Sequence, residues 1–323
     1  MFARERGLHR AVAKGARKPG TKLTGKSEPL NINRMLLAKG RSLDIITQCE
    51  SIETFGSLRK DLERLSYALY YAELTQVFGQ GLSEEAAKYF DRLSLSIGLM
   101  AESPREPALL CLEFEFALLD LLGIKPELDV CVACRHPLNE QNLSSFNHEL
   151  GGLLCQPCYQ QMRRRAGGGG DGQGERFKGL AVKEGVEPTY SAQESTQVPR
   201  HDSRYDSAHG SRHGSTNGSA DGLWQDWDRD SQLAVGNMAR RREAIDGQRA
   251  NVFVTPMVWK RLILARTSSV LLNDGLHADA LVEGEKNSQM KATQAARRVM
   301  QGYIEYKAAR RMRSLDLLAN LPS

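Results

Sequence analysis

The chain has 323 residues, of which 41% are hydrophobic and 26% are charged, so it is long enough for two domains and can bury a core. Its formal net charge is +5, but the first 48 residues alone contain eleven Lys and Arg against three Asp and Glu. The opening stretch, MFARERGLHR, lacks the apolar segment of a signal peptide, and no run approaches the ~18 apolar residues of a membrane span. We therefore expect a soluble cytoplasmic protein, without membrane contact, whose cysteines stay reduced.

The basic block near the start favours a polyanionic partner such as nucleic acid. A well-solvated surface without a ligand is the alternative. The candidate phosphate contacts are nine cations of this block: Arg10, Lys14, Arg17, Lys18, Lys22, Lys26, Arg34, Lys39 and Arg41.

Residues 1–52 predict short β-strands. Apolar residues alternate with basic ones in LHRAVAKGA, and two further apolar runs follow in PLNINRMLLAKG and RSLDIITQCE. Gly and Pro clusters separate the three runs, which is typical of a small twisted sheet or barrel.

Residues 20–27 read GTKLTGKS, which matches the phosphate-binding loop pattern G-x-x-x-x-G-K-[ST] at every position. That loop requires a buried strand before it and a helix after it. Pro29 would remove an N–H from such a helix, and Arg17, Lys18 and Pro19 precede the loop in place of an apolar strand. We therefore expect a turn between strands, and nucleotide hydrolysis is the weaker alternative.

A helical region is expected over residues 53–165. Apolar residues at spacings of three and four predict a helix that begins at Thr54, and a second is predicted from Glu84 to Leu99 with Ser83 as its N-cap. A third helix, from Pro107 to Leu122, is apolar on nearly all sides and should be central and buried.

Four of the six cysteines form two C-x₂-C pairs: Cys131, Cys134, Cys155 and Cys158. Two such pairs can close a tetrahedral site for one structural zinc ion, with the hairpin SFNHELGGLL between them. A redox pair, two disulfides and coincidence are the alternatives, and a reduced compartment disfavours the disulfides. Cys49 and Cys111 lie in apolar contexts and are expected to be packing residues.

Composition changes sharply after the second cysteine pair. Residues 166–250 are rich in Gly, Ser, His and Asp and contain few large aliphatic residues, so we expect a disordered, low-complexity insertion. Residues 251–323 regain apolar stripes, and Thr255-Pro256 is typical of a helix start. These C-terminal helices should pack on the helices that precede the insertion.

Five segments together resemble, in the same order, the RecO family of bacterial DNA repair and recombination mediators: RERGLHRAVAKGARKP, LLAKGRSLDIITQCE, LRKDLERLSYALYYAEL, GGLLCQPC and YIEYKAARRMRSLDLL. The resemblance implies an α+β fold in which an N-terminal OB-type barrel precedes a helical domain with a zinc knuckle. It implies binding to single- and double-stranded DNA at the nucleoid, strand annealing and help in loading RecA. The implied partners are RecR and the C-terminal tail of the single-strand-binding protein SSB.

Two features depart from the family pattern. Members of the family usually carry roughly two more β-strands before the position that matches Met1. An OB barrel has five strands, so two of them would be missing from this chain. The chain therefore begins inside the expected barrel: either the true N-terminus is longer, or the barrel is broken and DNA binding is weakened. The insertion at 166–250 is the other departure.

The leading interpretation is thus a non-enzymatic DNA-binding mediator without catalytic residues. A protein-interaction scaffold with impaired DNA binding is the alternative, and a nucleotide hydrolase is the enzyme alternative.

Overall fold

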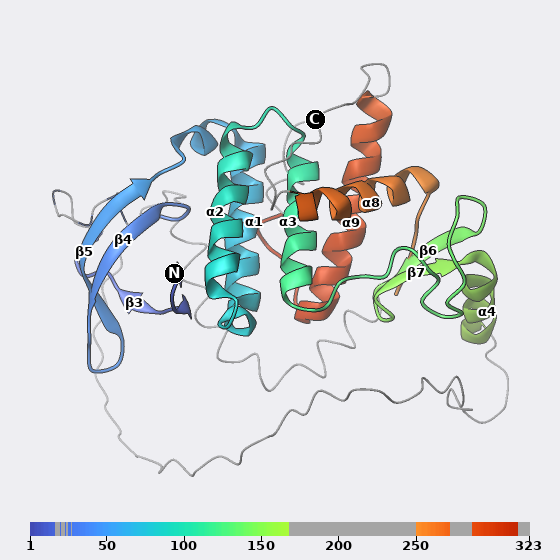
Figure 1. Cartoon of the computed structure of the whole chain (residues 1–323), viewed down its shortest axis with the longest axis horizontal. Coiled ribbons are helices and arrows are strands. Elements are labelled where there is room, and N and C mark those ends of the chain that lie inside the picture. The colour runs from blue at the N-terminus through green and yellow to red at the C-terminus, as the bar shows by residue number, and fades with distance from the viewer. Residues whose placement is uncertain are drawn as a thin grey trace, which may run out of the picture. The chain divides into compact units, whose positions relative to one another are not determined.

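The structure is a computed structural model, shown in Figure 1. It describes residues 1–16, 20, 23, 25–26, 28–167, 250–271 and 286–315. The expected insertion lies almost wholly outside these residues. None of the described helices is both long and apolar enough to cross a lipid bilayer.

The N-terminal segment is built from short strands, as its composition predicts. Strands β1 and β2 form a two-stranded ribbon, and a three-stranded sheet has the order β3-β5-β4, with β3 parallel and β4 antiparallel to β5. The strand expected in LHRAVAKGA is divided between β2 and β3. The bounds are β1 Phe2–Ala3, β2 Gly7–Leu8, β3 Ala11–Val12, β4 Ile32–Ala38 and β5 Asp44–Glu53.

The loop of the GTKLTGKS stretch packs onto this sheet. Leu23 is buried with Ile46 and Cys49 in a small core that is separate from the main core of the protein. The residues described after Lys26 form a turn and then strand β4, so the helix that a phosphate-binding loop requires is absent from this described stretch. This agrees with the interpretation of the stretch as a turn between strands.

The first long helix begins later than predicted. A short 3₁₀ helix, η1 (Gly56–Lys60), follows the strands, and α1 covers Leu62–Phe78. Asp61 caps α1 because its carboxylate accepts a hydrogen bond of 3.1 Å from the backbone N–H of Arg64. The prediction of a helix start at Thr54 was therefore wrong, because a cap at Asp61 sets the boundary.

The prediction that Ser83 caps the next helix was also wrong. A second 3₁₀ helix, η2 (Gly79–Leu82), precedes α2 (Ala86–Glu102), and the Ser83 hydroxyl donates backwards to the carbonyl oxygen of Gln80. Its hydroxyl is therefore engaged with the preceding turn and does not cap α2.

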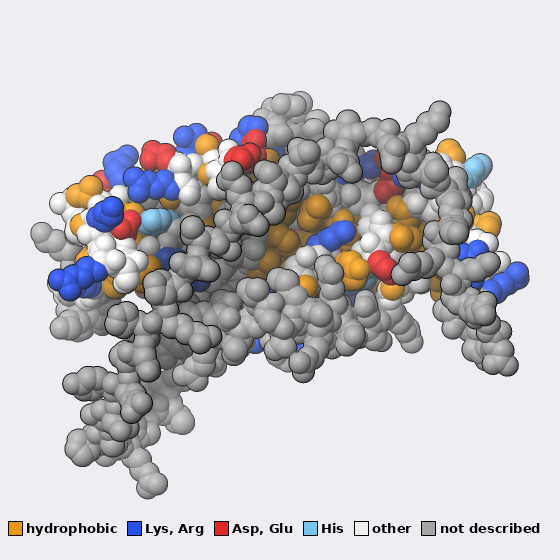
Figure 2. Space-filling model, turned by 90° about the horizontal axis from the view of Figure 1, so that it is seen from below, with side chains coloured by type: hydrophobic (Ala, Val, Ile, Leu, Met, Phe, Trp, Pro, Cys, Tyr) orange, Lys and Arg blue, Asp and Glu red, His pale blue; other side chains and the backbone are white. Residues whose placement is uncertain are grey.

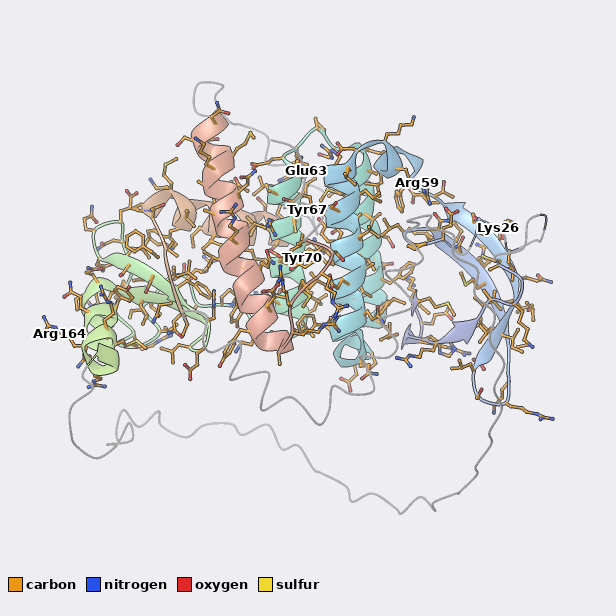
Figure 3. The ribbon with its side chains drawn as sticks, turned by 180° about the vertical axis from the view of Figure 1, so that it is seen from behind. Lys26, Arg59, Glu63, Tyr67, Tyr70 and Arg164 are labelled. Carbon is orange, nitrogen blue, oxygen red and sulfur yellow. The ribbon has the colours of Figure 1, made fainter. Side chains whose placement is uncertain are left out.

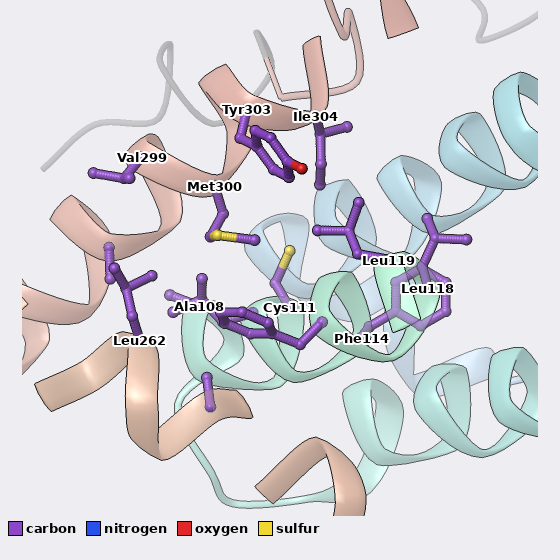
Figure 4. Close-up of a cluster of buried hydrophobic side chains, with 14 of the residues drawn as sticks. Ala108, Cys111, Phe114, Leu118, Leu119, Leu262, Val299, Met300, Tyr303 and Ile304 are labelled. Carbon is purple, nitrogen blue, oxygen red and sulfur yellow. The ribbon is translucent and has the colours of Figure 1, made fainter. Parts of the chain in front are cut away.

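Helix α3 (Pro107–Leu121) is the centre of the fold, as its apolar sequence predicts: all its residues from Ala108 to Leu119 are buried. Figure 4 shows side chains of α3, such as Cys111 and Phe114, beside those of the C-terminal helices. The two carboxylates in this buried stretch both have partners: Glu113 pairs with Arg105, and Glu115 accepts a hydrogen bond of 2.8 Å from the Tyr70 hydroxyl.

The C-terminal helices complete the core of the helical region. Helix α8 (Pro256–Leu271) begins after Thr255, as predicted, and α9 (Lys286–Ala308) follows. Both pack against α3. The chain then turns back to α1, where the buried Glu73 carboxylate accepts hydrogen bonds of 2.9 and 2.8 Å from the backbone N–H groups of Arg313 and Ser314.

A second sheet carries the cysteine pairs. Its order is β7-β6-β8, formed by β6 (Leu143–Asn147), β7 (Gly152–Cys155) and β8 (Asn251–Phe253), and helix α4 (Gln156–Gly167) continues directly from β7. Strands β6 and β7 are the hairpin expected between the cysteine pairs. We call residues 127–167 the cysteine module.

Candidate metal centre and basic surfaces

The structure brings the four predicted cysteines together. The Sγ atoms of Cys131, Cys134, Cys155 and Cys158 all lie within 4.8 Å of one another. The Sγ atoms of Cys134 and Cys155 are 3.7 Å apart. A tetrahedral ion with Zn–S bonds of about 2.3 Å requires S···S distances of about 3.8 Å, so the arrangement fits one metal ion.

Backbone hydrogen bonds shape the first knuckle. The N–H of Arg135 donates to the carbonyl oxygen of Cys131 at 2.8 Å. The N–H of Cys131 donates to the carbonyl oxygen of His136 at 2.8 Å. Arg135 itself has a φ of 61°, in the left-handed region that closes such a turn. The imidazole of His136 is exposed and is not among the four clustered ligands.

The second knuckle depends on close contact with the first. Gly152 lies against residue 127, where a Cβ atom would come within 2.5 Å of the Glu127 carbonyl oxygen. The N–H of Val132 donates to the carbonyl oxygen of Leu153 at 2.9 Å. Strand β7 therefore runs directly beside the first pair and delivers Cys155 at its end and Cys158 in the first turn of α4.

The electrostatics of the Cys131 sulfur favour a thiolate. Burial acts to raise its pKa, but hydrogen bonds from the backbone N–H groups of Cys155, Cys134 and Ala133 outweigh burial and lower the pKa to about 7. The Cys155 N–H lies 3.4 Å from this sulfur. Burial and the neighbouring sulfurs raise the pKa of Cys158. Four crowded thiols can ionise together only when a cation neutralises them.

Three of the nine predicted cations gather at one end of the N-terminal sheet. Ala11 pairs with Asp44 and Ala38 with Ile45, so Arg10 lies at the same end as the β4–β5 turn, which contains Lys39 and Arg41. All three are exposed. We call them the sheet-end cations.

The acid at this end, Asp44, already has a side-chain partner, since its carboxylate lies 3.0 Å from Nε2 of His9. Lys14, which follows β3, is also exposed.

The structure places two other predicted cations elsewhere. The Lys26 ammonium is half-buried and donates to the Cys49 carbonyl oxygen at 3.3 Å, which holds it against the sheet (Figure 3). Arg34 lies 3.3 Å from the carboxylate of Glu50 on the exposed face of β4 and β5. Arg17, Lys18 and Lys22 lie outside the described residues.

Comparison with known protein families adds an independent finding. The family model "Recombination protein O N terminal" matches residues 1–55, and "Recombination protein O C terminal" matches residues 59–167. The two models follow one another in this chain and together cover about half of it. The chain belongs to the RecO family. The matched segments of this RecO-family chain contain the sheet-end cations and the four clustered cysteines.

Individual relatives agree with the family models. A protein named DNA repair protein RecO from Symbiobacterium thermophilum is 38% identical over 159 residues, which are 49% of this chain and 62% of that protein. A protein of the same name from Moorella thermoacetica is 37% identical over 158 residues, 49% of this chain and 58% of that protein. A third, from Gloeobacter violaceus, is 35% identical over 165 residues, 50% of this chain and 62% of that protein. The chain thus spans about 60% of the length of these relatives.

One basic group was missed by sequence reasoning. Arg163, Arg164 and Arg165 are exposed on the last turns of α4, directly after the second cysteine pair. The signal was present in the sequence, since QPCYQQMRRRAG contains three basic residues and no acidic one.

Proposed function

We propose that this chain is a non-enzymatic DNA-binding mediator of recombination and repair, which binds and anneals single-stranded DNA and assists RecA loading onto SSB-coated DNA. One observation carries the proposal: both RecO family models match this chain in order. The proposal places the protein with cellular DNA, at the nucleoid, and gives it RecR and the SSB tail as partners. These activities and partners follow from the family resemblance.

The sheet-end cations supply the physical basis for DNA contact. Arginine and lysine neutralise phosphates irrespective of sequence, so binding should weaken steeply with salt. Neutralising two strands lowers their mutual repulsion, and base pairing can then proceed without a nucleophile or a general base. The protein therefore needs only to place cations along the phosphate backbone.

The architecture that we propose extends this interpretation. Residues 1–52 would correspond to part of an OB-type barrel, and residues 53–165 with 251–323 to a helical domain. In the described part of residues 1–53, the strands form a two-stranded ribbon and a separate three-stranded sheet, which supports a partial barrel. Residues 166–250 would be an insertion in the helical domain.

We further propose that the four cysteines hold one structural zinc ion. Four sulfur donors at tetrahedral spacing support zinc over harder cations, which prefer oxygen. With four protein ligands the metal has no open coordination position. Its role would be to stabilise the cysteine module and to fix the start of α4.

The test of DNA binding is a salt titration of a fluorescent single-stranded oligonucleotide with the full chain and with the variant Arg10/Lys39/Arg41→Ala. Loss of three phosphate contacts should reduce the slope of log affinity against log salt by about 2. The control variant Lys88/Lys291/Arg298→Ala removes the same charge from exposed positions on α2 and α9. Equal slopes in the two variants would refute the sheet-end assignment.

Two alternatives make different predictions in the same assays. A scaffold with impaired DNA binding predicts no binding by the unmodified chain, even at low salt. A nucleotide hydrolase predicts ATP turnover that disappears in Lys26→Ala. The contact of Lys26 with the Cys49 carbonyl oxygen argues against the second alternative, because that ammonium is held at the sheet.

A further inference from the structure

Helix α4 presents two different faces. Its inner face consists of half-buried Cys158, Tyr159 and Met162, which pack against the main core. The exposed positions hold amides and guanidinium groups together with one proline, and no acid: Gln156, Pro157, Gln160, Gln161, Arg163, Arg164 and Arg165. An outer face of this composition is basic along its C-terminal half.

Three of the four acids of the surrounding module, Glu127, Asp129 and Glu140, are engaged by cations outside α4. The Glu127 carboxylate lies 3.2 Å from Arg135, that of Asp129 lies 2.7 Å from Arg266, and the Glu140 carboxylate lies 2.7 Å from Lys260: each pair joins residues outside α4. In the described part of the chain, no acidic residue forms an ion pair with Arg163 or Arg164. The positive charges of Arg163 and Arg164 are thus not cancelled by these three acids.

The arginines are also positioned by the fold. The guanidinium of Arg163 lies 5.9 Å from the ring centroid of Tyr159, one helical turn earlier, and this contact orders the side chain. Arg164 lies on the outer side of α4 (Figure 3). Figure 2 shows Lys and Arg side chains projecting at the edge where α4 lies, whereas basic and acidic side chains are intermixed over the strands.

We infer that the outer face of α4 is a second contact surface for the phosphates of single-stranded DNA, separate from the sheet-end cations. The inference rests on the proposed DNA-binding function. Guanidinium groups bind phosphate oxygens in a bidentate manner, and glutamine amides donate to the same oxygens. The cysteines fix this surface, because Cys158 lies in the first turn of α4 and Cys155 immediately precedes the helix.

The test compares the full chain with Arg163/Arg164/Arg165→Ala in the salt titration described above. Three lost contacts should lower the slope by about 2, so the unmodified chain loses about 16-fold more affinity than the variant between 50 and 200 mM salt. The loss should be the same for oligonucleotides of different sequence, since phosphate contacts carry no sequence information.

Two controls separate DNA contact from other roles. Lys88/Lys291/Arg298→Ala matches the loss of charge, and thermal unfolding of both variants measures any stabilisation of the α4 C-terminus by its arginines. If the α4 variant is less stable but keeps the salt slope of the charge-matched control, the arginines serve the helix only and the inference is overturned.

The remaining outcomes are equally distinct. Binding of a poly-glutamate peptide that depends on the three arginines, with unchanged DNA binding, would assign α4 to an acidic protein and overturn the inference. Absence of DNA binding by the unmodified chain would refute the proposed function, whereas DNA binding that is insensitive only to the α4 substitutions would refute this inference alone.

Discussion

The N-terminal sheet and the cysteine module are both small β structures, but they are stabilised in different ways. The sheet buries a core of its own, Leu23, Ile46 and Cys49, whereas Phe146 and Leu153 of the module belong to the main core. The module also has four sulfur donors, which the sheet lacks. A small sheet with few buried residues has marginal stability of its own. Because the module shares the main core, a substitution in the module should destabilise the whole helical region, whereas a substitution in the core of the sheet should destabilise the sheet alone.

Removal of one exposed sulfur should give the largest effect. Cys134→Ala eliminates one of four ligands at an exposed position, so little packing is lost with it. We expect the metal content to fall from about one ion per chain to near zero and the free energy of unfolding to fall by on the order of 4 kcal/mol. Elemental analysis and urea denaturation measure the two quantities.

Cys49→Ala is the control for the metal, because Cys49 lies in the N-terminal sheet, and it should retain the ion. Equal stability of Cys134→Ala and the unmodified chain would show that the module folds without the metal.

The contact between the module and the main core should be nearly as important. Phe146 is fully buried, and its ring lies 5.6 Å from that of Tyr303 on α9. Phe146→Ala should cost about 4 kcal/mol, because the cavity opens within the shared core, and should shift the helical unfolding transition measured by circular dichroism.

Ile46→Ala opens a cavity in the separate core of the N-terminal sheet. It should increase hydrogen exchange in β4 and β5 while the helical transition stays in place. A shared shift of that transition in both variants would contradict the proposed independence of the sheet.

The main core contains a carboxyl group that makes its stability depend on pH. Burial raises the pKa of Glu115 from an ordinary value of 4.5 to about 7, although Arg297 and the Tyr70 hydroxyl act to lower it. The unfolded chain releases this proton near pH 4.5 and the folded chain near pH 7. Stability is therefore lost as pH rises through this window, by roughly 3 kcal/mol.

Glu115→Gln removes this titration, so its stability relative to the unmodified chain should increase between pH 4.5 and 7.5. Denaturation across this range measures the difference, with the exposed Glu84→Gln as control. A parallel pH profile for Glu115→Gln and the unmodified chain would exclude Glu115 as the source.

The smallest effect is expected on the exposed face of the N-terminal sheet. Arg34 and Glu50 form an ion pair whose side chains are 75% and 70% exposed. Such pairs contribute about 0.5 kcal/mol or less, so Arg34→Ala should leave the free energy of unfolding nearly unchanged. A loss above about 1 kcal/mol would show that the sheet depends on its surface more than on its small core.

Several elements could be predicted because their causes are local. The x₂ spacing within each cysteine pair and the Gly151-Gly152 turn between strands predicted the ligand set and its hairpin, and Thr255-Pro256 predicted the start of α8. Helix boundaries that depend on competing caps were predicted less well, since Ser83 is used by the preceding turn and Asp61 caps α1.

The role of Lys26 shows the limit of motif reasoning. The stretch GTKLTGKS around it matches a phosphate-binding loop, but Pro29 argued against the helix that must follow such a loop. The sequence nevertheless predicted Lys26 as a contact for the phosphates of DNA. In the structure, Lys26 lies in a turn and its ammonium donates to the carbonyl oxygen of Cys49 on strand β5, a partner that no local pattern identifies.

The sequence by itself determined the set of four clustered sulfurs and the buried central helix, because short spacings and a nearly continuous apolar run encode them, and the family was recognised from the resemblance of five segments. Tertiary structure decided which charges face solvent. Glu73 is used to bind the backbone of residues 313 and 314, Asp44 to bind His9, and the α4 arginines remain exposed. These outcomes depend on contacts between segments far apart in the chain, and whether a charge is paired or exposed is fixed only when those segments meet.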